Sequence, residues 1–195
     1  MSYRLACLTS AIALAAGAGS AQEMNFNRIA SFPVVLNMAE GEDMSRESAP
    51  EIIDVTSDGM TLVYTDSPLE ALGRIDITDP ANPAPLGNIA LPGEPTSVAV
   101  IGATAFVGIN TSESYTAPSG MIKAYDVGTG TEEASCDLPG QPDSVAKSPD
   151  GAFIAVAIEN ERDEDLNDGL IPQLPAGSLV MVTIADGSLD CDSLM

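Results

Sequence analysis

The chain has 195 residues, with 29 Asp and Glu against 7 Lys and Arg and no His, so its formal charge is −22. The lack of His excludes a Ser-His-Asp triad and a His-ligated zinc site, and so few basic residues exclude the basic stripe that nucleic-acid binding requires. Because 45% of the residues are apolar, the chain is too hydrophobic for a disordered protein.

Residues 1–21 have the three-part pattern of a signal peptide. Arg4 supplies the positive charge, an apolar run follows at residues 5–16, and small residues lead up to Ala21. The run is too short to span a bilayer comfortably, although a buried N-terminal helix would also be apolar. We therefore expect cleavage before Gln22 and an exported protein, periplasmic or extracellular, whose mature chain has no membrane span.

Residues 22–49 are expected to form an N-terminal strand and a linker. The strand is placed at residues 26–32, where apolar and polar residues are mixed in a short segment before the first repeat of the chain.

Residues 50–195 contain three copies of one pattern. Pro50, Pro95 and Pro142 begin the copies, so successive copies start 45 and 47 residues apart. In each copy two β-rich segments flank a turn that contains Gly, and a polar loop leads to a third strand and a weaker fourth strand. The expected third strands are 73–77, 121–127 and 178–184, and the expected fourth strands are 87–91, 133–138 and 189–194.

Four short strands in each period of about 45 residues are typical of β-propeller blades. We expect an all-β fold with three four-stranded blades, at residues 50–94, 95–141 and 142–195. A β-sandwich built from similar hairpins is the alternative, but the Gly-x-Pro starts shared at Gly93 and Gly140 favour blades.

Three blades are fewer than the roughly four to eight blades of a closed propeller. The strand expected at residues 26–32 would complete the last blade of a ring, and that blade is not in the sequence. We therefore expect the N-terminal part of a longer propeller, incomplete or open, which a truncated gene or a shortened expression product would both explain. Open sheet edges favour self-association, so a ring of two or more copies is the alternative.

Cys136 and Cys191 are the two cysteines that remain after the leader. An exported protein reaches an oxidising compartment, where such a pair can form a disulfide. The blade assignment puts them on the outer strands of neighbouring blades, which leaves the distance between them undetermined. The sequence therefore leaves their pairing open.

The loops between second and third strands and the turns between blades are expected to share one rim of the molecule. The third of these loops, residues 159–176, is the longest and the richest in acids, and dense carboxylates on irregular backbone suit Ca²⁺. It is no EF-hand, because its glycine stands one residue late, at Gly169, and Leu174 occupies the place of the final Glu. The alternative is a solvated acidic loop without a metal. The expected metal ligands are Glu159, Glu161, Asp163, Asp165 and Asp168.

Residues 93–99, 110–115, 140–146 and 158–165 carry a family resemblance, and the Glu-Asn-Glu-Arg-Asp-Glu-Asp run in the last is the most specific. Together they resemble the exported bacterial β-propellers described as phytase-like, with "esterase-like activity of phytase", whose members are often labelled alkaline phosphatase-like. The resemblance covers about residues 24–185. It implies a hydrolase that acts on phosphoric monoesters.

The resemblance also implies a mechanism that needs no His. A calcium ion would neutralise a small phosphate ester and lower the pKa of a bridging water. Arg162 would bind the phosphate, and its alternative role is an ion pair with neighbouring acids. No residue is identified as catalytic.

The first functional hypothesis is therefore the N-terminal part of a secreted, phytase-like propeller with calcium-assisted phosphoesterase activity. The alternatives are a non-enzymatic propeller that binds a partner or scaffolds at the surface, and an inactive truncated fragment.

Overall fold

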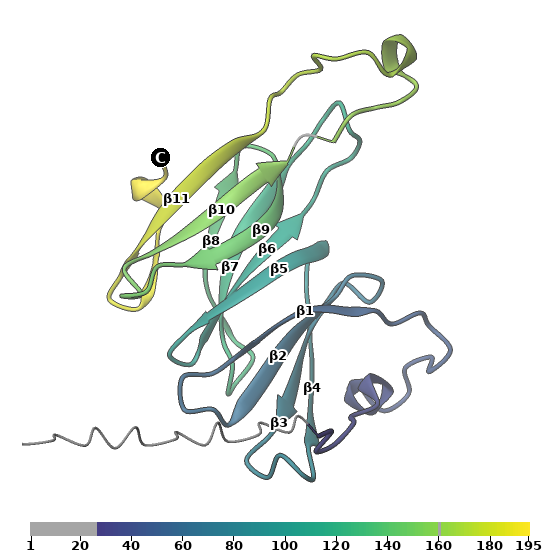
Figure 1. Ribbon diagram of the computed structural model, residues 1–195, viewed down its shortest axis with the longest axis vertical. Coiled ribbons are helices and arrows are strands. Elements are labelled where there is room, and N and C mark those ends of the chain that lie inside the picture. Colours follow the sequence, from purple (N-terminus) through teal and green to yellow (C-terminus); the bar gives the residue numbers. More distant parts are fainter. Residues whose placement is uncertain (1–26, 160) are drawn as a thin grey trace, which may run out of the picture.

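The computed structural model describes residues 27–159 and 161–195 of the chain. Their regular structure consists of three four-stranded sheets and three short 3₁₀-helices. In every sheet the strands lie in chain order, and the three sheets follow one another along the molecule (Figure 1). The prediction of an all-β fold with propeller-type blades is confirmed. The signal peptide predicted at residues 1–21 lies outside the described residues.

We call the three sheets blade 1, blade 2 and blade 3. Blade 1 contains β1 (Pro50–Val55), β2 (Thr61–Asp66), β3 (Ala71–Asp76) and β4 (Ala84–Ala90). Blade 2 contains β5 (Glu94–Ile101), β6 (Thr104–Asn110), β7 (Gly120–Asp126) and β8 (Glu132–Leu138). Blade 3 contains β9 (Gln141–Lys147), β10 (Phe153–Glu159), β11 (Ser178–Ala185) and β12 (Ser188–Asp190). The 3₁₀-helices are η1 (Val34–Asn37), η2 (Leu166–Gly169) and η3 (Cys191–Ser193), and no helix of the described residues is long and apolar enough to cross a membrane.

The hydrophobic core lies between the blades, in two layers. Val63 of blade 1 packs with Val107 of blade 2 in one layer, and Phe106 of blade 2 packs with Ile154 of blade 3 in the other. Because β6 is covered on both faces, its sequence is a nearly continuous apolar run and all but its end residues are buried. In β11, by contrast, buried and exposed residues alternate over most of the strand. Burying each large aliphatic side chain contributes about 1.5–3 kcal/mol.

The turn between the first and second strands has the same design in blades 1 and 3. In blade 1, the Asp58 carboxylate accepts hydrogen bonds from the Thr56 hydroxyl at 2.7 Å and from the Met60 N–H at 2.9 Å. In blade 3, Asp150 accepts from Ser148 at 2.7 Å in the same way. The glycine that follows each Asp has a positive φ, a conformation that glycine adopts without steric cost. The Asp-Gly pair recognised in the repeats therefore closes both hairpins.

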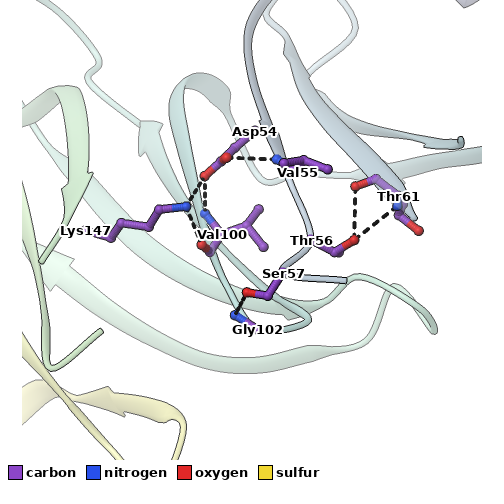
Figure 2. Close-up of polar contacts among 8 residues, drawn as sticks. All are labelled: Asp54, Val55, Thr56, Ser57, Thr61, Val100, Gly102 and Lys147. Atoms are coloured by element: carbon purple, nitrogen blue, oxygen red, sulfur yellow. Dashed lines mark hydrogen bonds and ion pairs between the residues drawn. The ribbon is translucent and has the colours of Figure 1, made fainter. Parts of the chain in front are cut away.

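The first strands of the three blades are connected by one polar cluster (Figure 2). Asp54 on β1 accepts a hydrogen bond from the Val100 N–H of β5 and pairs with the Lys147 ammonium of β9. Close by, the turns of blades 1 and 2 are joined by hydrogen bonds between Ser57 and Gly102, at 2.9 and 3.0 Å. These contacts satisfy backbone groups at strand edges that a packed sheet would otherwise leave unpaired.

A disulfide joins blades 2 and 3. Cys136 lies on β8 and Cys191 begins η3, and their Cα atoms are 5.4 Å apart. The pairing that the sequence left open is therefore formed, and the outer strands of neighbouring blades are close enough for it.

The prediction of a strand at residues 26–32 is wrong for residues 27–32, the part that the structure describes, because these residues have no regular secondary structure. They lead into η1, and the side chain of Asn37 at its end is buried. Asn37 donates to the Tyr64 hydroxyl at 2.9 Å and accepts from the Gly87 N–H of β4 at 3.1 Å. The edge strand β4 of blade 1 is therefore hydrogen-bonded by the Asn37 side chain and not by an additional strand.

Candidate functional site

Two loops from neighbouring blades lie together at one end of the molecule, where the β10–β11 loop extends beyond the sheets (Figure 1). They are the β6–β7 loop, residues 111–119, and residues 161–177 of the β10–β11 loop. Residues from both loops, including Tyr115, Glu161 and Asp163, line one shallow hollow of about 340 Å³. We call this surface the acidic rim. The expectation that loops of this kind share one rim holds for these two.

The β6–β7 loop is held closed at its base by hydrogen bonds between its two ends. The Ser119 N–H donates to the Ser112 hydroxyl at 3.0 Å, and that hydroxyl donates to the Ser119 carbonyl at 3.1 Å. The Thr111 N–H also bonds the Ser119 carbonyl, at 3.1 Å. These bonds present Glu113 and the exposed ring of Tyr115 at the tip of the loop.

The β10–β11 loop is folded around Gln173. The Gln173 amide accepts from the Asp163 N–H and donates to the Asp163 carbonyl, both at 2.9 Å. Asn167 and Asp168 have positive φ values of 51° and 56°, a conformation that Asn and Asp adopt more readily than most residues. Residues 166–169 of this loop form the short 3₁₀ turn η2, which these two residues interrupt with a non-helical backbone.

Acidic residues stand where β9 and β10 reach the rim, and their charges affect one another. Glu159 is exposed at the end of β10, and its slight desolvation together with the negative charges of Asp143 and Glu161 raises its pKa above the ordinary value. Asp143 stands on β9 and Glu159 ends β10, so the blade itself places them on this rim. The acidic side chains at this rim therefore repel one another.

The sequence-predicted ligands are only partly brought together. Four of the five border a second hollow of about 570 Å³, together with Tyr115, Arg162 and Glu164; Asp168 does not border it. The Asp163 carboxylate already accepts a hydrogen bond from the Asp165 N–H at 2.9 Å. Among residues 27–159 and 161–195, no three acidic or cysteine side chains lie close enough together to hold a metal ion. The four that border the hollow are Glu159, Glu161, Asp163 and Asp165.

Arg162, the predicted phosphate-binding residue, is half exposed beside these acids. Its guanidinium lies 3.3 Å from the Glu164 carboxylate, and both side chains face solvent. This is the ion pair that the sequence offered as the alternative role for Arg162. An exposed pair of this kind contributes about 0–1 kcal/mol, so it does not prevent Arg162 from binding an anion.

Three residues of the rim were missed by reasoning from the sequence. Tyr115 borders both hollows, Gln141 borders the smaller one, and Gln173 fixes the loop that carries the acids. Tyr115 stands in a loop that the repeat pattern had already assigned to the rim, so its position was a usable signal. Gln173 had no such signal, because its role depends on how its loop folds back.

A protein-family model described as Choice-of-anchor I domain matches residues 51–193 of the chain. The match covers nearly all of the three blades. It does not confirm the phytase-like family that the sequence resembles. None of the curated proteins compared with the chain matches it.

Two solved structures have a similar, propeller-type fold. Hydrazine synthase from Kuenenia stuttgartiensis aligns with a TM-score of 0.54 and 20% sequence identity, over 72% of this chain and 35% of its own. A luciferin-regenerating enzyme aligns with a TM-score of 0.50 and 16% identity, over 72% of this chain and 46% of its own. The chain therefore spans less than half the length of either protein. At these identities the likeness shows the fold alone.

Proposed function

The chain belongs to the choice-of-anchor I domain family, and from that premise we propose that it is a propeller-type binding domain of an exported, anchored protein. The family name refers to an anchor, and the signal-peptide pattern at residues 1–21 supports export. The ligand-binding face of this domain is the acidic rim.

The observation that carries this proposal is that the negative charges of Asp143 and Glu161 act on the carboxylate of Glu159. The raised pKa of Glu159 reports that burial and neighbouring charges disfavour its ionised form. Carboxylates that repel one another in the free protein gain free energy when a cation binds between them. The ligand of the rim is therefore cationic, and Ca²⁺ is the cation whose preference for oxygen ligands suits it.

The rim offers the kind of ligand atom that Ca²⁺ prefers, but in the described arrangement of the loops these atoms are not placed to bind the ion. All of its donors are oxygens, but no three of the described acidic side chains are arranged to hold the ion. We propose that Glu159, at the end of β10, and the acids of the β10–β11 loop would hold Ca²⁺ only in another arrangement of that loop, because the described one does not bring three of them together. The residues that would hold it are Glu159, Glu161, Asp163, Asp165 and Asp168.

Isothermal titration calorimetry of the full chain with CaCl₂ tests this function. Wild type is expected to bind Ca²⁺, and E159Q/E161Q is expected to weaken binding by about tenfold or more, about 1.4 kcal/mol. The matched control, E133Q/D186N, removes two negative charges at the opposite end of the blades, one near the start of β8 and one in the β11–β12 turn, and should leave binding nearly unchanged. If both double variants weakened Ca²⁺ binding equally, the effect would come from the net charge of the protein, and this result would contradict a site at the rim.

A second candidate function is calcium-assisted hydrolysis of a phosphate ester. It is favoured by the position of Arg162, which borders the same hollow as Glu159 and Glu161. Its guanidinium would leave Glu164 and bind the phosphate, because a guanidinium matches two phosphate oxygens. Phosphate release from p-nitrophenyl phosphate and from phytate, with and without CaCl₂, tests this activity. Turnover that R162Q abolishes would support it, and no turnover with either ester would reject it.

A further inference from the structure

A hollow of about 350 Å³ lies between η1 and blade 1. Helix η1 packs beside β3 and β4 (Figure 1), and the segment that follows it, residues 38–46, contributes further side chains to the lining. We call this cavity the blade 1 hollow. No residue of the rim loops borders it, so it is a separate site from the acidic rim.

Two consecutive turns after η1 carry charged side chains to the blade 1 hollow. In the first, the Ala39 N–H donates to the Glu42 carboxylate at 2.8 Å, and the Glu42 N–H donates to the Ala39 carbonyl at 3.1 Å. The second is closed by the Arg46 N–H, which donates to the Asp43 carbonyl at 3.0 Å. These bonds fix the backbone at Glu42 and Arg46, and both residues border the hollow.

Positive charge is concentrated at the blade 1 hollow, in a chain whose formal charge is −22. Arg46 and Arg74 line it, two of the seven Lys and Arg residues of the chain. Arg46 is exposed and forms no ion pair in the part of the chain that the structure describes. Arg74 donates to carbonyl oxygens of β4 and of the turn after β7, at 2.9–3.1 Å, so its charge is fixed in the wall without a carboxylate partner. Glu42 is the one acid among the described residues of the lining, whose charges therefore sum to +1.

The blade 1 hollow is also where buried polar atoms lack a partner. Among the described residues, the buried side-chain atoms without a hydrogen bond are Arg74 Nε and Asn88 Oδ1. Both side chains line this hollow. Nearly all buried polar atoms in native proteins are paired, because an unpaired one loses its hydrogen bonds to water without compensation. The Nε–H donates and Oδ1 accepts, so a ligand that pairs both atoms needs an acceptor group and a donor group.

The rest of the lining is largely aliphatic. Leu36 of η1 and Leu86 of β4 are 53% and 41% exposed, and Leu69, from the turn between β2 and β3, borders the same hollow. An aliphatic group of a ligand would remove part of this surface from water, which is favourable. A volume of about 350 Å³ is near the lower end of the range for small-molecule sites, so the hollow suits a compact ligand.

We propose that the blade 1 hollow binds a free aliphatic α-amino acid in its zwitterionic form. Arg46 binds the carboxylate, because a guanidinium can donate two parallel hydrogen bonds to it, and the carboxylate also supplies an acceptor for Arg74. The ammonium group donates to Asn88 Oδ1 and to the Glu42 oxygen that Ala39 does not bond. Since Oδ1 is covered in the described arrangement, the bound state includes a turn of the Asn88 side chain. The aliphatic side chain of the ligand lies against the three leucines.

Isothermal titration calorimetry of the full chain with L-leucine tests the proposal. Wild type should bind L-leucine, and glycine, which has no aliphatic side chain, should bind more weakly. N-acetyl-L-leucine keeps the carboxylate without an ammonium group, and L-leucine amide keeps the ammonium group without a carboxylate. The Kd of each should be about tenfold higher than that of L-leucine, or more. If N-acetyl-L-leucine bound as tightly as L-leucine, the hollow would suit the carboxyl terminus of a peptide, and the proposal would be overturned.

Two single variants locate the site. R46Q and E42Q change exposed side chains on the turns after η1, so circular dichroism should show both to be folded. Each should raise the Kd for L-leucine by about tenfold or more. E42Q should leave the binding of N-acetyl-L-leucine unchanged, because that probe has no ammonium group for Glu42 to accept from. The matched control is R28Q, which removes the same charge as R46Q from an exposed residue that does not border the hollow.

The remaining outcomes decide against the proposal. If wild type bound none of the four probes, the hollow would hold only water. If R28Q weakened L-leucine binding as much as R46Q, the effect would come from net charge and not from this site. E159Q/E161Q, the double variant of the acidic rim, should bind L-leucine like wild type, so the two sites are tested separately.

Discussion

The carboxylate of Asp54 and the ammonium group of Lys147 lie 2.8 Å apart, although 93 residues separate them in the sequence. Both groups also bond the backbone of Val100, which donates to Asp54 at 2.8 Å and accepts from Lys147 at 2.7 Å. This single pair therefore connects β1, β5 and β9, one strand from each blade (Figure 2).

Replacing Asp54 should destabilise the contacts among all three blades. We expect D54N to lower the free energy of unfolding by about 1–2 kcal/mol, because the Val100 N–H and Lys147 lose a charged acceptor. K147M should cost less, about 0.5–1 kcal/mol, since the Lys147 side chain is 41% exposed and solvent screens the pair. Urea denaturation of the two variants and of the double variant measures the coupling. A D54N protein as stable as wild type would contradict this role.

The same carboxylate should make stability depend on pH. Burial alone would raise the pKa of Asp54, but hydrogen bonds from Lys147, Val100 and Val55 outweigh it and hold the pKa below its ordinary value. Such a group stabilises the folded state above its ordinary pKa, and the contribution is lost as the pH falls through the lowered pKa. The stability difference between wild type and D54N should therefore shrink in strong acid. Thermal denaturation at neutral and strongly acidic pH measures it, and a constant difference would contradict the assignment.

Glu159 should have the opposite dependence on pH. Its pKa is raised, first by burial and then by Asp143 and Glu161, so its ionised form destabilises the fold. That penalty is absent below its ordinary pKa and is complete once the pH has risen through the raised pKa. We expect E159Q to stabilise the protein by about 0.5 kcal/mol or less at neutral pH, with the gain disappearing in acid. Melting temperatures of E159Q and wild type across this range provide the check, and E133Q serves as a control outside the rim.

Removing the disulfide should destabilise the junction between blades 2 and 3. Cys136 and Cys191 are 55 residues apart in the sequence, and a bridge over such a span contributes about 2–4 kcal/mol. C136A/C191A is therefore expected to unfold at a lower urea concentration than wild type. A reducing agent should lower the stability of wild type and leave that of C136A/C191A unchanged. An equal response of both proteins to reduction would disprove the assignment.

Gly73 should not tolerate a side chain, although it stands in an ordinary strand. A Cβ added to Gly73 would overlap the ring of Tyr64, which lies across it on β2. We expect G73A to cost about 1–3 kcal/mol through overpacking. G128A is the matched control, because a Cβ at Gly128 would meet only the Asp126 carboxylate at an ordinary 3.4 Å. Urea midpoints of the two variants should differ clearly, and similar midpoints would show that Tyr64 moves aside freely.

The blades could be predicted from the sequence because their signals are local. Pro50, Pro95 and Pro142 recur at nearly constant spacing, and turns such as Asp58-Gly59 lie between β-rich segments. The segment at residues 26–32 has a strand-like composition, but a strand also needs a free edge of matching register. The prediction gave this segment the edge of a further blade and not that of blade 1; in the structure residues 27–32 lead into η1, and Asn37, which no local pattern indicated, bonds the edge of blade 1.

The candidate site could be predicted only to the level of its loops. Strand order placed Glu159 and the acids after it at the rim, since the end at which a strand stops follows from its direction. The ion pair between Arg162 and Glu164, two residues away, was one of the two roles that the sequence offered, whereas the fold of the loop depends on the more distant Gln173. The disulfide depends on the distance between blades, to which η3 contributes by placing Cys191 beside β8. Sequence spacing does not determine that distance.

The disulfide has a consequence for the order in which the molecule opens. In the part of the chain that the structure describes, a covalent bond crosses from blade 2 to blade 3, while blade 1 is held by packing and by polar contacts such as those of Asp54. Local unfolding begins in the units with the lowest opening free energy. Blade 1 should therefore detach as a cooperative unit while blades 2 and 3 remain folded together. Amide protons of β1–β4 would then exchange with solvent earlier than those of β5–β11, and a protease would cut first between β4 and β5.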